Sequence, residues 1–309
     1  MFQGMHYVYE VYKEMSFSKA AKNLYISQPS LSAAIKKVEQ RIGFPIFDRS
    51  STPVQLTNLG KEYIRSIEII MDVEGSFQNY VQDMQNMQVG SLAIGGTNLF
   101  ASYVLPPLLS RFSEQYPHIR VNLVEANTTE LTEKLFSGTL DLLIDNQTMD
   151  PAIYEKLFFC EEHLLLAVPS HFISNQPVRN YALSAADIRK GRHLNSQIPP
   201  IPLDFFQNEP FLLLKSGNNT RTRADKICHN AHFSPCVKLE LEQQITAYNL
   251  SRYGMGISFC GDTLICHVPE EQNLLYYKLD NQDAIREVNF YFKRNRYMTK
   301  IITEFLNLI

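Results

Sequence analysis

The sequence predicts a protein of mixed α+β and α/β class, with a helix-turn-helix head, one long helix and a larger α/β body. Three observations predict it. Two short serine-capped helices follow each other near the start of the chain, a stripe of apolar residues at helical spacing comes next, and strands then alternate with helices. A chain of 309 residues has room for two or three domains of ordinary size.

Charge is unevenly distributed along the chain. The whole sequence has a formal net charge of −3, which does not by itself indicate a nucleic-acid partner. Residues 1–58, however, hold seven basic and four acidic side chains and carry +3, so the remainder carries −6. This asymmetry indicates a basic head on an acidic body.

Neither export nor membrane insertion is expected. No apolar run follows a basic start, and no stretch approaches the ~20 apolar residues of a membrane helix. The cysteines are odd in number and form no CxxC pair, so we expect reduced thiols in a cytoplasmic protein. They are Cys160, Cys228, Cys236, Cys260 and Cys266.

The head contains the stretch SFSKAAKNLYISQPSLSAAIKKVEQRIG. Ser16 or Ser18 is expected to cap a first helix over residues 19–24. Its paired alanines, Ala20 and Ala21, are small, as required where the two helices of a helix-turn-helix cross closely. The first half of the stretch therefore fits the supporting helix of such a motif.

A second helix follows a break at residues 25–27. Ser27 is expected to cap it, Pro29 falls in its first turn, and Gly43 ends it in the left-handed conformation. Apolar residues at helical spacing form its buried face; these are Leu31, Ala34, Ile35 and Val38.

The other side of this helix carries polar and small side chains, namely Gln28, Ser30, Ser32, Ala33, Lys36 and Lys37. Glutamine can bond the edge of adenine, alanine can meet a thymine methyl group, and hydroxyls and lysines can hold phosphates. The pattern therefore favours binding in the major groove of DNA. The alternative is an ordinary amphipathic hairpin whose polar face is only solvated.

At this point the sequence resembles the LysR-type transcriptional regulators. The matching residues are the aromatic start at Tyr7 and Tyr9, the stretch SFSKAAKNLYISQPSLSAAIKKVEQRIGFPIFDRS and the segment VQLTNLG. The family pattern of serine-phenylalanine, paired alanines and serine-glutamine-proline-x-leucine-serine is met nearly throughout. The resemblance continues to the C-terminus.

The resemblance implies a winged helix-turn-helix with residues 49–55 as the wing and Arg49 on the phosphate backbone. It completes the expected DNA-binding set, which adds Ser18, Lys19, Ser27, Pro29 and Arg49 to the residues named above. One departure is Ala33-Ala34, where many relatives carry a long polar side chain. Recognition of the DNA sequence is then expected to depend on Gln28, Pro29 and the shape of the DNA.

The resemblance also implies the partners. We expect a double-stranded DNA operator, a small-molecule effector, and self-association into a dimer or a dimer of dimers, with RNA polymerase as a further contact. A bacterial cytoplasmic regulator of this kind is no enzyme and needs no metal or cofactor. The corresponding domains are residues 1–58 for DNA binding, 59–89 for the linker and 90–309 for the effector.

The linker is expected to be one long helix over residues 60–89. Its apolar residues approximate a 3.5-residue repeat; they are Tyr63, Ile67, Ile70, Phe77, Val81 and Met84. Such a stripe must be buried. Packing on the protein's own body is one alternative, and the resemblance favours packing against the linker of a second subunit.

Strands and helices alternate after Gly90. Strands are expected at residues 91–94, 120–125 and 140–144, and helices at 105–115 and 129–137. This alternation favours parallel βαβ units, whose ligands bind at the carboxyl ends of the strands.

The resemblance implies that this body is a two-lobed effector domain like the periplasmic binding proteins. The chain would leave lobe I near residues 163–168 and return near Val268. Lobe I would then comprise about 91–163 and 268–309, and lobe II about 164–267. A returning strand is expected at residues 288–292 and a closing helix at 298–309.

Two polar loops precede helices in this body and are expected to face the cleft. Helix N-termini with nearby hydroxyls bind carboxylates and other anions, so we expect an anionic metabolite. The resemblance implies that the effector-binding residues are those matching the family's ligand-contacting loops, namely Thr97, Asn98, Thr128, Asn219 and Thr220. Arg221 is a further candidate, either as a carboxylate clamp or as an ordinary surface arginine. The alternative is that these residues are only helix caps, which Ser, Thr and Asn favour in any case.

The remaining chemistry-bearing residues give no site. The histidines show no metal-ligand spacing with acids or cysteines; they are His163, His171, His193, His229, His232 and His267. Cys228 and Cys236 are either a metal or thiol switch or unrelated packing thiols. Relative to the peroxide-sensing branch of the family, Cys228 matches the resolving cysteine but Asn219 replaces the reactive one, so that mechanism fails.

No catalytic motif is present, since nucleophile elbows, P-loops and dinucleotide fingerprints are absent from the sequence. The sequence therefore favours a LysR-type regulator. The alternative is a small-molecule binding protein or an α/β enzyme without specific DNA binding, and salt-sensitive duplex binding separates the two.

Overall fold

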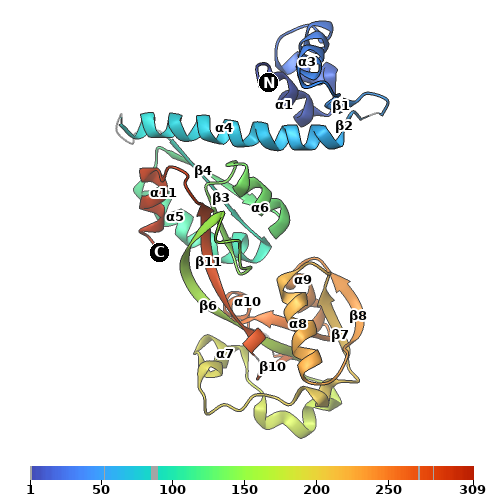
Figure 1. Cartoon of the computed structure of the whole chain (residues 1–309). Helices are drawn as coiled ribbons and strands as arrows, with labels where there is room; N and C mark the ends of the chain where they lie inside the picture. The colour runs from blue at the N-terminus through green and yellow to red at the C-terminus, as the bar shows by residue number, and fades with distance from the viewer. Residues whose placement is uncertain (1, 52, 85–89, 271, 281) are drawn as a thin grey trace. The chain divides into compact units, whose positions relative to one another are not determined.

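The structure is a computed structural model (Figure 1). It describes residues 2–51, 53–84, 90–270, 272–280 and 282–309. The chain forms two compact units, which we describe separately. The first comprises Met1–Met87, Glu133–Leu140 and Asn295–Lys300, and the second comprises Gln88–Thr132, Asp141–Arg294 and Ile301–Ile309.

The head of the first unit is a winged helix-turn-helix. Its elements are α1 (Met5–Glu14), α2 (Phe17–Asn23), α3 (Gln28–Ile42) and the antiparallel strands β1 (Phe47–Asp48) and β2 (Gln55–Leu56). Ser16 caps α2, so Ser18 lies inside the helix, and Ser27 caps α3 as predicted. Gly43 ends α3 with a φ of 89°. The expected wing is the loop between β1 and β2.

The head has its own hydrophobic core. Ala20 and Ala21 are buried in it, as expected for closely crossing helices, together with Leu31, Ile35 and Val38. Ala34 was expected on the same face but is only half-buried. The helical period of the sequence therefore placed the core side of α3 correctly except at its smallest residue.

Helix α4 (Asn58–Met84) begins directly against the wing. The Gly60 N–H donates to the Thr57 hydroxyl at 2.9 Å, which caps the first turn. A Cβ at Gly60 would lie 2.1 Å from the Ile46 carbonyl oxygen, so only glycine permits this approach. The helix was expected to continue to residue 89, but residues 85–89 lie outside the described part of the chain.

The two halves of the predicted apolar stripe on α4 have different surroundings. Tyr63 and Ile67 are buried in the core of the head, and Ile70 packs against that core. Phe77 and Val81 are exposed, at 67% and 39%. The side chain of Met84 is outside the described residues. The prediction of one continuous intersubunit stripe is therefore wrong for its first half, which packs within its own head.

The far part of α4 is tied to the two short segments that complete the first unit. Arg296 donates to the carbonyl oxygens of Leu140 at 2.8 Å and Gly138 at 3.1 Å. Its Nε lies 3.2 Å from the Asp72 Oδ1, and both side chains are nearly buried. This ion pair fixes α4 to residues 133–140.

The second unit contains a nine-stranded sheet. The strands are β3 (Gly90–Gly96), β4 (Ile119–Glu125), β5 (Leu142–Asp145), β6 (Tyr154–Pro169), β7 (Pro210–Leu214), β8 (Cys236–Leu241), β9 (Ile257–Gly261), β10 (Leu274–Lys278) and β11 (Ile285–Lys293). Their order is β4-β3-β5-β11-β6-β9-β7-β8, with β10 also paired to β6. Strand β3 is parallel to β4 and β5, and β7 is parallel to β8 and β9, which confirms the predicted parallel α/β units.

Two lobes share this sheet, and the long antiparallel strands β6 and β11 pass between them (Figure 1). Lobe I contains β3, β4 and β5, and lobe II contains β7, β8, β9 and β10. The return to lobe I was expected near Val268, but β10 still pairs with the lobe II half of β6, with Leu274 opposite Pro169. The chain returns only through β11, which includes the strand expected at 288–292.

The helices and short helical turns of the remaining chain complete the fold. They are η1 (Phe100–Val104), α5 (Leu105–Gln115), α6 (Thr128–Phe136), η2 (Ile173–Tyr181), α7 (Ala185–Arg189), η3 (Arg192–Leu194), η4 (Leu203–Phe206), α8 (Asn219–Asn230), α9 (Gln244–Arg252), α10 (Asp262–His267), η5 (Gln282–Ala284) and α11 (Lys300–Leu306). The helix predicted at 105–115 matches α5, and the closing helix is shorter than predicted. Among the described residues, no helix is both long enough and apolar enough to cross a bilayer.

Candidate functional site

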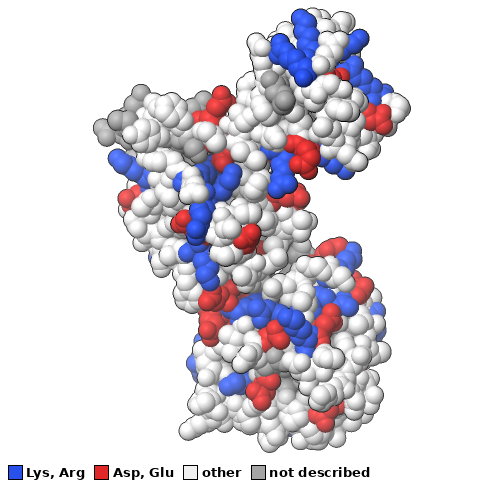
Figure 2. Space-filling model, viewed as in Figure 1, with Lys and Arg blue, Asp and Glu red and all other residues white. Residues whose placement is uncertain are grey.

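The residues expected to meet DNA lie on the surface of the head. Gln28 and Pro29 open α3, and Lys36 and Lys37 follow two turns later, all exposed. Ser18, Lys19, Ser27, Ser30, Ala33 and Arg49 are also exposed, and Ser32 is half-buried. Basic side chains gather on the head in Figure 2. This face is a polar, basic surface of the kind that binds a nucleic-acid backbone.

Arg49 has internal partners as well as solvent exposure. Its Nη2 donates to Glu39 Oε2 at 2.9 Å and its Nη1 to the Ser32 hydroxyl at 3.3 Å. Its guanidinium also lies over the ring of Phe17, 5.0 Å from the centroid. Arg49 therefore joins the base of the wing to α3. It fixes the position of the wing relative to the helix and also places a positive charge at the surface.

Tyr25 was not among the residues expected to meet DNA. It occupies the turn between α2 and α3 with a φ of 55°, and it is 96% exposed. A large aromatic residue held in the left-handed conformation is uncommon. A side chain exposed beside the start of α3 is placed where the helix would approach DNA. Tyr25 lies in the predicted break between the two helices. The sequence of such a break does not indicate which of its side chains are exposed.

Five of the six residues expected at the effector site line one cavity in the second unit. The cavity has a volume of about 80 Å³, and its walls come from both lobes. The expected residues that line it are Thr97, Asn98, Thr128, Asn219 and Thr220. They lie after β3, at the start of α6 and at the start of α8, so segments distant in sequence meet at helix N-termini.

Arg221 does not line this cavity. Its guanidinium forms ion pairs with Asp225 at 2.9 Å and with Glu240 at 2.5 Å, and it donates to the Leu214 carbonyl at 2.8 Å. The proposed carboxylate clamp at Arg221 is therefore wrong. Position 221 follows the two lining residues on α8, and the helical turn carries its side chain away from them.

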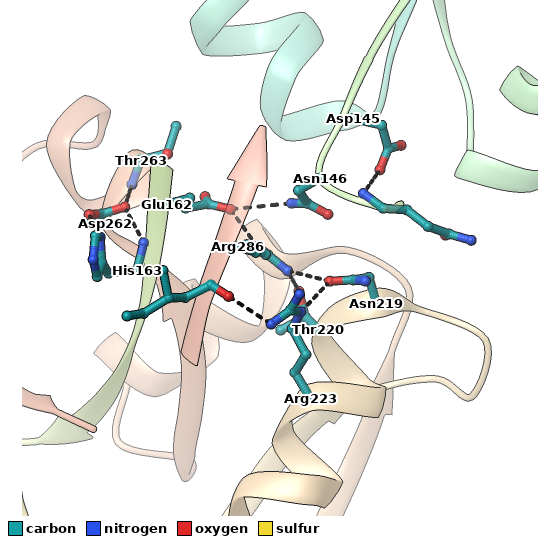
Figure 3. A network of polar contacts seen from close by, with 12 residues as sticks. Asp145, Asn146, Glu162, His163, Asn219, Thr220, Arg223, Asp262, Thr263 and Arg286 are labelled. Carbon is teal, nitrogen blue, oxygen red and sulfur yellow. Dashed lines mark hydrogen bonds and ion pairs between the residues drawn. The ribbon is translucent and has the colours of Figure 1, made fainter. Parts of the chain in front are cut away.

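Arg286 supplies the cationic group that the sequence reasoning missed. It extends from β11 into the cavity wall and is 4% exposed. Its Nη1 donates to Thr220 Oγ1 at 2.9 Å and Asn219 Oδ1 at 3.1 Å, and its Nε forms an ion pair with Glu162 at 2.7 Å (Figure 3). Nothing in the sequence around Arg286 distinguishes it, because its role depends on the antiparallel pairing of β11 with β6.

Asp145 brings a buried carboxyl group to the lobe I wall. Burial raises its pKa, even though the Gln147 N–H and the Thr128 hydroxyl donate to it at 2.7 and 2.9 Å. The Thr128 hydroxyl is thus already occupied by a protein partner. With one arginine, Asp145 and Glu242 in its wall, the cavity is not a simple anion site.

Gln244 is a buried polar residue of the cavity wall. It opens α9 and is 8% exposed, and neither its amide oxygen nor its amide nitrogen has a partner within the described part of the chain. Buried amides in proteins are almost always bonded. A buried, unbonded amide in the wall of a cavity is well placed to bind a ligand.

Cys228 does not have the features of a reactive thiol. All five cysteines are unpaired, and burial raises the pKa of the Cys228 thiol to about 12. A thiol of that kind forms little reactive thiolate. Asn219, in the position of the reactive cysteine of peroxide sensors, accepts hydrogen bonds from Arg223 and Arg286 instead.

Three residues without any metal-ligand spacing in the sequence lie together in the fold. His163, His193 and Asp262 each offer a ligand atom, and these atoms lie within 4.8 Å of one another. They belong to β6, η3 and α10, which are separated by tens of residues, so no spacing in the sequence could indicate the group. None of the three lines the cavity described above.

The fold and its two polar surfaces define a DNA-binding regulator with a separate ligand-binding domain. Two family descriptions match: "Bacterial regulatory helix-turn-helix protein, lysR family" over residues 2–61, and "LysR substrate binding domain" over residues 85–309. The chain belongs to the LysR family of transcriptional regulators, which are not enzymes.

Individual relatives agree with this assignment. The HTH-type transcriptional regulator YcgK of Bacillus subtilis (strain 168), itself uncharacterized, is 30% identical over 98% of this chain and 92% of its own. Full-length CbnR in complex with its target DNA has a TM-score of 0.64 at 18% identity, covering 100% of this chain and 98% of CbnR. Full-length OxyR from Pseudomonas aeruginosa has a TM-score of 0.70 at 19% identity, covering 100% and 92%. These two structures share the fold.

Proposed function

We propose that this regulator reads its operator through the N-terminal half of α3, associates through the outer half of α4, and binds a small effector in the cavity between the two lobes. The observation that carries the effector assignment is Gln244, a buried amide without partners in the wall of that cavity. The other two assignments rest on exposed surfaces of the head and of α4.

The DNA-reading surface is Gln28 with its neighbours. Gln28 is the first residue of α3 and is exposed, which suits a contact with a base edge. Lys36 and Lys37 lie further along the helix and suit phosphates. Ser32 and Arg49 are bonded to each other, so together they brace the helix against the wing.

Association uses the exposed apolar face of α4. Ile69, Val73, Phe77 and Tyr80 follow one another at intervals of three or four residues, and all are exposed. Val73 and Phe77 are 65% and 67% exposed, which is unusual for neighbouring large apolar residues on one helix. A second copy of the same helix would bury this face, giving a dimer or a dimer of dimers.

The effector is expected to carry both an anionic group and a hydrogen-bond donor. Arg286, Thr220 and the N-terminus of α8 suit an anionic oxygen on the lobe II side. Asp145 lies in the lobe I wall and suits a donor or a cationic group. A cavity of about 80 Å³ favours a small molecule, so amino acids and hydroxy acids are the first classes to examine.

The effector assignment is tested by a thermal-shift screen of a panel of α-amino acids, hydroxy acids and dicarboxylates on the full-length protein. A compound that binds the folded state raises the melting temperature by mass action. Gln244→Met keeps the approximate size of the side chain but removes its amide, and it should abolish the shift given by the best compound. Thr246→Val, an exposed position on the same helix, is the matched control and should keep it.

Equal shifts in wild type, Gln244→Met and Thr246→Val would remove Gln244 from the site. Thr97→Val is a second probe, because Thr97 lines the cavity and its hydroxyl has no bond to any described residue. Thr128→Val is less suitable, since it would also remove a bond to Asp145.

Association is tested by light scattering on Phe77→Glu. A charge in an apolar interface should reduce the mass to that of a single chain while the far-ultraviolet circular dichroism is unchanged. Lys61→Glu changes an exposed residue near the start of the same helix and should leave the mass unaltered. An unchanged mass for Phe77→Glu would show that association uses another surface.

A further inference from the structure

Three side chains with metal-binding atoms meet in the second unit away from the cavity. His163 lies on β6, His193 on η3 and Asp262 at the first position of α10. His193 Nε2 is 2.9 Å from Asp262 Oδ2, and His163 Nδ1 is 3.4 Å from the same oxygen. His193 is almost fully buried, whereas His163 and Asp262 keep 22% and 14% exposure. The group is therefore open to solvent on one side.

The two oxygens of Asp262 have different roles. Oδ1 accepts hydrogen bonds from the backbone N–H groups of His163 at 3.1 Å and Thr263 at 2.8 Å. These bonds, drawn in Figure 3, fix the carboxylate. They leave Oδ2 facing the two imidazoles. The backbone thus holds one oxygen in place and presents the other together with two ring nitrogens.

The two separations between Asp262 Oδ2 and the imidazole nitrogens fit the coordination shell of a small divalent ion. Zinc binds histidine nitrogens and carboxylate oxygens at about 2.0–2.2 Å, which places neighbouring ligands of a tetrahedral site roughly 3.3 Å apart. The separations of 2.9 and 3.4 Å lie on either side of that value. Two imidazoles and one carboxylate with an open side leave room for a water molecule as the fourth ligand.

The surroundings of His163 support a ligand role. Its second nitrogen, Nε2, lies 3.2 Å from Glu161 Oε1. A neutral imidazole can donate to only one of two carboxylates. With a cation at Nδ1, the ring donates Nε2–H to Glu161 and both contacts are satisfied. A carboxylate that orients a ligating histidine in this way is a common feature of zinc sites.

We propose that His163, His193 and Asp262 bind a divalent transition-metal ion of the zinc type, with Glu161 orienting His163. Nitrogen and oxygen ligands in this ratio suit Zn²⁺ and neighbouring ions better than Mg²⁺ or Ca²⁺, which prefer oxygen. The site connects β6, η3 and α10. It also lies one residue from Glu162, whose carboxylate holds Arg286 in the effector cavity.

The test uses untagged full-length protein that has been dialysed against a chelator and then titrated with Zn²⁺ in competition with a chromophoric chelator. Wild type should bind one Zn²⁺ per chain. His163→Gln and Asp262→Asn should each weaken that binding at least about 10-fold. His229→Gln changes an exposed histidine outside the group and should bind as wild type does. Visible absorption of bound Co²⁺ should show the intense bands of a four-coordinate site in wild type and in His229→Gln, and these bands should be lost in His163→Gln and Asp262→Asn.

Glu161→Gln keeps the test decisive if a ligand variant fails to fold. Its side chain is 55% exposed, so the fold should tolerate the change, and we expect about 10-fold weaker Zn²⁺ binding. The proposal is overturned if wild type binds no Zn²⁺, because the group is then a hydrogen-bonded triad with a charged His163. It is also overturned if folded His163→Gln, Glu161→Gln and His229→Gln all bind like wild type, because the ion then sits on surface histidines.

Discussion

The proposed DNA-reading surface of the head and the proposed effector cavity are both rich in polar side chains, but these side chains have different surroundings. In the head, Gln28, Lys36 and Lys37 stand in solvent on one short helix. In the cavity, Arg286, Glu162 and Asp145 are buried and bonded to their neighbours. In the head the binding surface and the core are therefore formed by different residues. At the cavity, the residues of the binding site also belong to the buried interior.

Function and stability should be coupled in the cavity but not on the exposed face of α3. A solvated side chain can be replaced at little cost to the fold, so substitutions on α3 should change only DNA binding. A buried charge leaves its partner without compensation when it is removed. Substitutions in the cavity should therefore change stability together with ligand response.

The largest effect is expected for Glu162→Ala. The side chains of Glu162 and Arg286 are 0% and 1% exposed. The substitution leaves the guanidinium buried, with Asn219 and Thr220 as its remaining hydrogen-bond partners among the described residues. We expect a loss of about 3–5 kcal/mol in the free energy of unfolding of the second unit, measured by urea denaturation.

Glu287→Ala is the matched control on the same pair of strands, because Glu287 forms its ion pair with Lys156 in solvent. It should lose no more than ~1 kcal/mol. The double variant Glu162→Leu with Arg286→Met should recover most of the stability lost by Glu162→Ala, since apolar replacement of a buried pair is often neutral. Equal losses for the buried and the exposed glutamate would contradict the comparison.

The next effect is expected at the surface of the head. Gln28→Ala should lose ~1–3 kcal/mol of discrimination at one base pair of a duplex selected from a random library. Its unfolding free energy should stay within ~0.5 kcal/mol of wild type, because the side chain is exposed. Fluorescence anisotropy with single-base variants of the duplex measures the first quantity. Unaltered preference at every base pair would show that Gln28 does not read the sequence.

The sequence predicted the two regions with unequal success, for the same physical reason. Caps, small crossing residues and the buried face of α3 are local properties, so Ser16, Ala20 and Ser27 were identified correctly. The loop before α6 was also a local signal and located Thr128 on the cavity wall, whereas Asn219 was identified by its match to the family's ligand-contacting loops.

Long-range pairing decided the rest. Arg286 reaches the cavity because β11 lies antiparallel to β6, which places it opposite Glu162. The pattern of α4 gave the correct helix but not the partner of its stripe, since Ile67 packs in the head and Phe77 does not. His163, His193 and Asp262 meet only through the tertiary fold.

A smaller effect is expected for Asp145→Asn. Burial raises the pKa of Asp145 above its unfolded value, so at neutral pH the ionised form makes the folded state less stable. The substitution should therefore raise the melting temperature at pH 7; a gain of about 1 kcal/mol corresponds to ~2–4 °C.

The pH dependence gives the sign of this effect. As the pH falls toward the raised pKa of Asp145, the folded wild type takes up a proton and recovers stability relative to Asp145→Asn. The advantage of the variant should thus shrink between neutral and acidic pH. Scanning calorimetry over that range checks it, and an advantage that grows on acidification would contradict the assigned direction. In Asp145→Asn, the thermal shift given by an effector with a hydrogen-bond donor group should also be smaller than in wild type.

The smallest effect on stability is expected for Lys36→Ala, which changes a solvent-exposed side chain of the head. Lys36 is exposed on α3 and makes no ion pair with any described residue, so its removal should leave the melting temperature unchanged. If it neutralises one phosphate, the slope of log K against log salt should fall by about 0.9 per chain, and all sequences should weaken alike. Lys190→Ala removes an exposed lysine of lobe II and should leave the slope as it is. Anisotropy titrations at several salt concentrations, with selected and unrelated duplexes, separate the outcomes. A loss confined to the selected duplex would make Lys36 a base-reading residue, and an unchanged slope would remove it from the interface.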